Sequence, residues 1–173
     1  MSSLYFQICS TFYLVLLMVV YFRKKKIMNI ENKIYSALII VTFIGLILDY
    51  ASTYIAIVNV ENIFLNFISK LYLVYLLIWL YLLTIYTFVI SFEVKRKDLQ
   101  FMKILKKYII PVVIASFLVY FSLVLILPLY NFSENGLVYT HGPAAELLYT
   151  VSAISFVFMI ICIIMRFKFV KTT

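Results

Sequence analysis

Residues 67–97 read FISKLYLVYLLIWLYLLTIYTFVISFEVKRK, a long apolar stretch that ends in a basic cluster. Lys70 is the only charged residue between Phe67 and Phe92. A helix needs about 17–25 mainly apolar residues to cross the ~30 Å hydrocarbon core of a bilayer. This stretch therefore predicts a transmembrane helix, whose start could lie as early as Ile63.

Four further stretches have a similar length and character. The five predicted spans are residues 4–22, 35–58, 67–92, 108–129 and 144–165. The chain is 66% hydrophobic and only 13% charged, with a mean hydropathy of +1.10, whereas soluble domains are about 45–50% apolar and about 25% charged. No stretch alternates apolar with polar residues as a membrane β-barrel requires. We predict an all-α fold, a polytopic transmembrane helical bundle that forms a single domain over residues 1–173.

The basic residues predict the orientation of this bundle. They follow the first and third spans and the fifth, at positions 23–26, 33, 95–97, 103, 106, 107, 166, 168 and 171. Alternation through five spans places these 14 of the 15 Lys and Arg residues on one side of the membrane, and Lys70 on the other. Because basic loops stay in the cytoplasm, we expect the N-terminus outside and the C-terminus in the cytoplasm. The predicted location is the cell membrane, with a multi-pass topology.

The same distribution argues against several functional classes. The net charge of +8 follows the membrane boundaries, so we expect the lipid bilayer as a partner and no nucleic acid. Cys9 and Cys162 fall in different spans and match no metal-ligand spacing. We expect no metal and no cofactor. The sequence contains no HEXXH motif, no P-loop and no other catalytic constellation, so it leaves open whether the chain serves an enzyme.

Asp49 and Lys70 are the ionisable residues expected inside the membrane. Asp49 lies about nine residues from the end of its span, roughly 13 Å deep, and Lys70 lies roughly 10 Å into the next span. Intramembrane acids usually face the bundle interior and find a partner. We expect these two side chains either to pair between the second and third spans or to reach separately towards the membrane surface.

Aromatic residues form a stripe along the third span. Tyr72, Tyr75, Trp79 and Tyr86 follow spacings of three, four and seven, which place them on one face of a helix. They could line a ligand site or a seam that moves during signalling. Ordinary helix packing and an interfacial aromatic belt explain the same pattern.

Residues 130–142 are the most polar segment on the expected outer side. Asn135-Gly136 is a turn signal, and a hairpin with Phe132 facing Val138 or Tyr139 follows from it. His141 completes the set of candidate ligand or signal residues, although a lone histidine is more often an ordinary surface residue.

Two stretches carry a resemblance to a known class of proteins. Residues 24–49 read KKKIMNIENKIYSALIIVTFIGLILD, and residues 136–158 read GLVYTHGPAAELLYTVSAISFVF. Both resemble the N-terminal membrane sensor regions of bacterial, Firmicutes-type sensor histidine kinases, some of which precede diguanylate cyclase domains instead. The resemblance implies a sensory domain that couples an extracellular or membrane cue to a cytoplasmic output domain. Such regions often have seven helices and are followed by an enzyme module, so we expect these residues to be the N-terminal part of a longer protein or a remnant that has lost its output domain.

Two other functional classes stay open on the sequence. A small transporter or channel would place Asp49 and Lys70 along a hydrated path, and usually shows repeats or broken helices. A non-catalytic accessory subunit would bind a partner through its helices. The ligand and the oligomeric state, including a homodimer, are also open.

Overall fold

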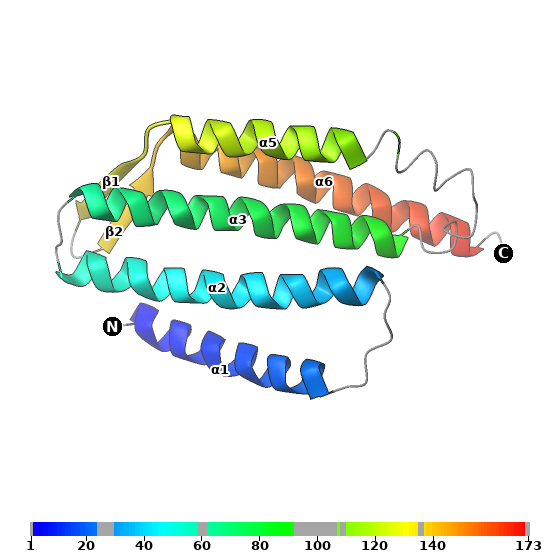
Figure 1. The fold of residues 1–173 in the computed structure, drawn as a ribbon, viewed down its shortest axis with the longest axis horizontal. Coiled ribbons are helices and arrows are strands. Elements are labelled where there is room, and N and C mark those ends of the chain that lie inside the picture. The colour runs from blue at the N-terminus through cyan, green and yellow to red at the C-terminus, as the bar shows by residue number, and fades with distance from the viewer. Residues whose placement is uncertain are drawn as a thin grey trace.

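The computed structural model describes residues 2–23, 30–58, 62–91, 107, 110–134 and 137–171. Within these ranges the chain forms five long helices and one two-stranded hairpin. The elements are α1 (Ser2–Arg23), α2 (Ile30–Val58), α3 (Asn62–Ser91), α5 (Ile110–Ile126), β1 (Tyr130–Glu134), β2 (Leu137–His141) and α6 (Pro143–Lys171). The helices lie side by side and alternate in direction, with the N-terminus and the hairpin at one end and the C-terminus at the other (Figure 1).

Three of these helices are long and apolar enough to cross a membrane. The segments are Ile30–Ile55, Phe64–Ser91 and Pro143–Phe167, and only a small share of each is fully buried within the bundle. Shorter apolar helices cover Gln7–Arg23 and Pro111–Ile126. The predicted all-helical fold is therefore confirmed, with three helices that could span a membrane, and the large apolar side chains exposed on the bundle fit a lipid environment.

Prolines mark the boundaries on either side of the hairpin. α5 ends at Ile126, short of the predicted end at residue 129, because Pro128 has no N–H to continue the helix and disfavours helical geometry in Leu127. α6 begins at Pro143 as expected, where the missing N–H would have no partner in the helix.

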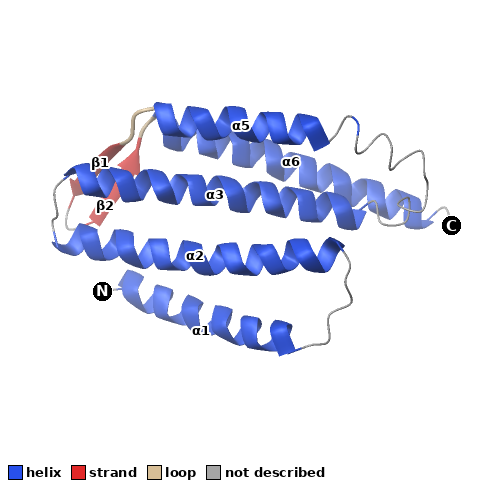
Figure 2. Cartoon of the chain, viewed as in Figure 1, coloured by secondary structure: helices blue, strands red, loops and turns tan. Residues whose placement is uncertain are grey.

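The hairpin predicted from Asn135-Gly136 is present. β1 and β2 pair antiparallel, and Phe132 is the register partner of Tyr139. The turn residues themselves lie outside the described residues. Figure 2 shows the two strands, which connect α5 to α6 in the sequence, at the end of the bundle beside the start of α3.

The core lies between α3, α5 and α6, with α3 as the central helix. Leu77 of α3 and Val124 of α5 have no exposed surface. The buried cluster contains Leu73, Leu77, Leu80, Val124, Leu129, Ala144, Ala145, Leu148 and Val151. The two alanines at the start of α6 allow its backbone to approach the other helices closely. α2 packs on the other side of α3, and α1 packs on α2 (Figure 1).

Candidate functional site

The Asp49 carboxylate lies between α1 and α2, in hydrogen-bonding contact with Gln7. Gln7 Nε2 donates to Asp49 Oδ2 at 2.8 Å and also to Thr53 Oγ1 at 2.8 Å. Thr53 lies one turn after Asp49, and its hydroxyl donates to the Asp49 carbonyl at 2.9 Å. The side-chain amide of Gln7, on α1, therefore hydrogen-bonds to side chains on two consecutive turns of α2.

A second polar contact continues the same interface. The Thr11 hydroxyl lies 3.1 Å from the Tyr50 hydroxyl, one turn along α1 from Gln7. Gln7, Thr11, Asp49, Tyr50 and Thr53 together form what we call the α1–α2 polar cluster. Hydrogen bonds of this kind hold apolar helices together where lipid surrounds them, because the alternative is a polar group without a partner.

Gln7 carries an unsatisfied polar atom inside this cluster. Its side chain is only 7% exposed, and Oε1 has no hydrogen-bond partner in the part of the chain that the structure describes. A buried carbonyl without a donor costs about 1–3 kcal/mol. Atoms of this kind are rare in folded proteins and each requires an explanation.

Lys70 and Asp49 lie apart, so of the two arrangements expected from the sequence the structure has the one in which they do not pair. Lys70 Nζ donates to the Leu125 carbonyl of α5 at 2.8 Å. The physical reason is that residue 70 faces α5 whereas Asp49 faces α1 and the first part of the aromatic stripe. A cation at this point stabilises the negative end of the α5 dipole and satisfies a carbonyl of its last turn.

The predicted aromatic stripe does lie on one face of α3, and that face contacts α2. Trp79 Nε1 donates to Thr42 Oγ1 at 3.1 Å, and the ring centroids of Tyr86 and Tyr35 are 5.7 Å apart. Tyr75 packs over Gly45, where a Cβ atom would overlap its ring.

Tyr72 and Tyr75, the stripe residues nearest the start of α3, are close to the α1–α2 polar cluster. Tyr75 packs over Gly45, which lies one helical turn before Asp49, and the ring centroids of Tyr72 and Tyr75 are 5.6 Å apart. The stripe residues are partly buried and serve as packing between α2 and α3, and Tyr72 and Tyr75 also border the cluster.

His141 lies apart from the cluster, at the base of the hairpin. Its Nδ1 accepts a hydrogen bond from the Gly142 amide at 2.7 Å, and its Nε2 lies 3.9 Å from Glu146 Oε1. Both side chains are 65% exposed. The six predicted site residues therefore fall in three places: the α1–α2–α3 interface, the end of α5 and the hairpin base.

No protein-family model, curated protein or solved structure matches the chain.

Sequence reasoning missed Gln7, the main partner of Asp49. A signal was available, because Gln7 and Thr11 are spaced by four residues on an otherwise apolar span, and so are Asp49 and Thr53. Residues four apart share a helix face. Two polar faces in neighbouring spans predict an interface, whereas a search restricted to opposite charges leads to Lys70.

A double-mutant cycle tests this assignment. Gln7→Leu removes the side-chain donor to Asp49 and should lower the free energy of unfolding in detergent by about 1–3 kcal/mol. Asp49→Leu in addition should restore part of this loss, because both partners are then apolar, and should give a coupling energy of about 1 kcal/mol or more. The matched cycle of Asp49→Leu with Lys70→Met should show coupling below about 0.5 kcal/mol. A larger coupling for residues 49 and 70 would contradict the structure.

Proposed function

We propose that the chain is a membrane-embedded sensory domain that transmits an extracellular or membrane cue to a cytoplasmic output domain, such as a histidine kinase, on its C-terminal side. The observation that carries the proposal is the continuity of α6. This helix begins directly after the hairpin and runs unbroken for 29 residues to the opposite end of the bundle. Because α6 is one continuous helix, a displacement of the hairpin would also displace the opposite end of α6.

The joint between the hairpin and α6 is tightly specified. Gly142 has a φ of 143°, and its carbonyl accepts hydrogen bonds from the amides of Ala145 and Glu146 at 2.9 and 3.0 Å. A Cβ atom at position 142 would lie 3.0 Å from the Pro128 carbonyl oxygen. The segment after α5, the hairpin and the first turn of α6 thus share one packed junction.

The proposal includes the five-span topology. In it the hairpin and the N-terminus are outside and the basic ends of the helices are in the cytoplasm. Supporting it, Arg23 and Arg166 lie near the ends of α1 and α6, at the end of the bundle opposite the hairpin (Figure 1). Lys24–Lys26 and the basic residues at 95–106 lie outside the described residues.

The proposal predicts output that depends on the hairpin and on helical phase. The complete chain is joined after Lys171 to a cytoplasmic histidine kinase module that lacks its own sensor, with zero to four alanines inserted between them. Because each added residue rotates a continuous helix by about 100°, kinase output should vary with a period close to that of the helix. In the fusions whose kinase is active, replacing the hairpin residues Phe132 and Tyr139 with alanine should change the kinase activity.

Thiol labelling checks the orientation in the same cells. After Cys9 and Cys162 are replaced, single cysteines are placed at positions 25, 96 and 135. An impermeant maleimide should label only position 135 in intact cells. Labelling of 25 and 96 instead would overturn the topology, and output independent of both phase and hairpin in a correctly oriented chain would overturn the sensory function.

A further inference from the structure

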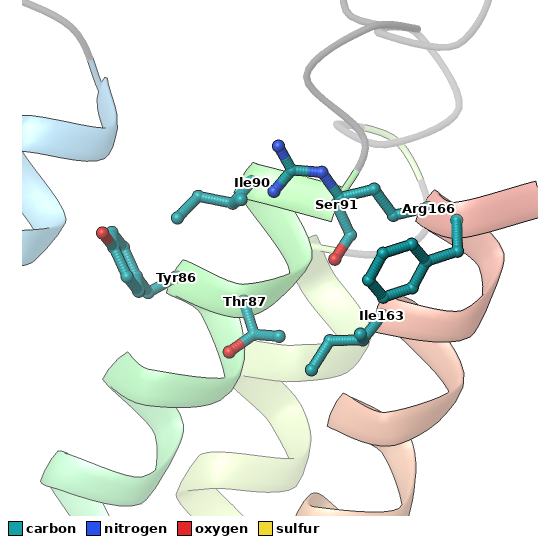
Figure 3. A pocket seen from close by; sticks show the side chains of 7 residues that line it. Tyr86, Thr87, Ile90, Ser91, Ile163 and Arg166 are labelled. Carbon is teal, nitrogen blue, oxygen red and sulfur yellow. The ribbon is translucent and has the colours of Figure 1, made fainter. Parts of the chain in front are cut away.

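A pocket of about 490 Å³ opens between α3 and α6, at the end of the bundle opposite the hairpin. Its lining residues are Tyr86, Thr87, Ile90, Ser91, Ile163, Arg166 and Phe167. Figure 3 shows the Arg166 side chain extending from α6 towards Ile90 and Ser91 of α3. The pocket is separate from the α1–α2 polar cluster and from the hairpin.

The lining combines one cation with hydroxyl groups and an apolar wall. Arg166 makes no ion pair or hydrogen bond to any other described residue, and its guanidinium carries five N–H donors. The Ser91 side chain is 7% exposed and its hydroxyl likewise has no described partner, whereas the Thr87 hydroxyl donates to the Leu83 carbonyl at 2.9 Å and keeps only acceptor capacity. Arginine N–H groups and serine hydroxyls donate hydrogen bonds to phosphate oxygens, and those from arginine are charge-assisted.

The apolar part of the pocket continues onto the outer surface of the bundle. Ile163 is 44% exposed and Phe167 is 68% exposed, next to the Arg166 guanidinium. A soluble anion would make no favourable contact with these apolar side chains. A molecule with a phosphate at one end and hydrocarbon at the other contacts both the polar and the apolar part of the pocket.

We propose that this pocket binds the phosphate headgroup of an anionic phospholipid, with Arg166 and Ser91 as donors to the phosphate and Ile163 and Phe167 along the acyl chain. The position at the basic end of the helices fits the membrane surface, where arginines at helix ends meet anionic headgroups. The proposal requires only that α3 and α6 cross the membrane, and does not depend on the sensory function.

Native mass spectrometry of the complete chain in detergent provides the test, with dioleoyl phosphatidylglycerol and dioleoyl phosphatidylcholine titrated as probes. The wild-type chain should bind one phosphatidylglycerol more tightly than any phosphatidylcholine. Arg166→Gln should weaken that binding about tenfold, because a charge-assisted pair is lost, and Ser91→Ala should weaken it less. Arg23→Gln is the matched control: it removes the same charge at the same end of the bundle, away from the pocket, and should change the affinity less than about twofold.

Each other outcome overturns the proposal. Equal binding of the two lipids, or equal losses in Arg166→Gln and Arg23→Gln, would mean that the pocket recognises no headgroup. Displacement of phosphatidylglycerol by millimolar inorganic phosphate, with Arg166-dependent phosphate binding, would assign the site to a soluble anion. Circular dichroism of each variant verifies the helical content, and Arg166→Lys provides a folded variant that should retain part of the affinity because it keeps the charge but not the planar fork.

Discussion

Replacing Gly45 with alanine should separate α2 from α3 and destabilise the bundle by about 1–3 kcal/mol. The ring of Tyr75 lies directly over Gly45, in the space that a Cβ atom would occupy. Either the Tyr75 ring must move away from residue 45 or α2 and α3 must move apart. Both outcomes also disturb the surroundings of Asp49, because Tyr75 packs against residue 45, one helical turn before Asp49.

A second substitution tests whether that contact is the cause. Tyr75→Leu shortens the side chain, so adding it to Gly45→Ala should recover most of the lost stability, whereas Tyr75→Leu alone should be mildly destabilising. Unfolding of the purified chain in mixed detergent micelles measures each free energy. Ile44→Ala is the control, because this neighbouring side chain is 48% exposed and its truncation should have a small effect. A loss in Gly45→Ala that Tyr75→Leu leaves unchanged would refute the contact.

Replacing Gly142 with valine should open the junction between the hairpin and α6. The φ of 143° at this position is strained for any residue with a Cβ, at about 1–3 kcal/mol, and the Pro128 carbonyl 3.0 Å away restricts the side chain further. Relief of this strain moves the carbonyl of residue 142 away from the amides of Ala145 and Glu146, which donate to it in the first turn of α6. Hydrogen exchange of the amides in 137–148 should become at least about tenfold faster, which corresponds to about 1.4 kcal/mol.

The matched control introduces the same side chain nearby. Thr150→Val places valine on an exposed position of α6 and removes only an intrahelical hydrogen bond to the Glu146 carbonyl. Exchange in 137–148 should stay close to wild type. If Gly142→Val also leaves exchange unchanged, the hairpin and α6 are not joined through this residue, and the transmission route proposed above loses its first step.

The long apolar helices and the boundaries beside the hairpin could be predicted from the sequence, because they depend on local chemistry. Apolar length predicts the three long helices, Pro128 and Pro143 mark where α5 ends and α6 begins, and Asn135-Gly136 predicts the hairpin. Each of these signals acts within a few residues and needs no knowledge of neighbouring helices.

The partner of Lys70 could not be predicted in the same way. A helix that is apolar on all sides gives no periodicity from which to read its buried face. Whether Lys70 faces α2 or α5 depends on the rotation of α3, and packing of side chains such as Leu77 and Val124 decides that rotation. The aromatic stripe was the exception, because four aromatic residues at helical spacing do define a face, although the spacing did not indicate that this face contacts α2.

The lengths of α3 and α6 have a consequence for the surrounding lipid. α3 has 30 residues and α6 has 29, so each helix is about 45 Å long, whereas the hydrocarbon core of a bilayer is about 30 Å thick. Both helices must therefore tilt or extend into the headgroup layer. Lengthening the acyl chains of the surrounding lipid by a few ångströms should leave the stability of the bundle nearly unchanged, because both helices have length in reserve.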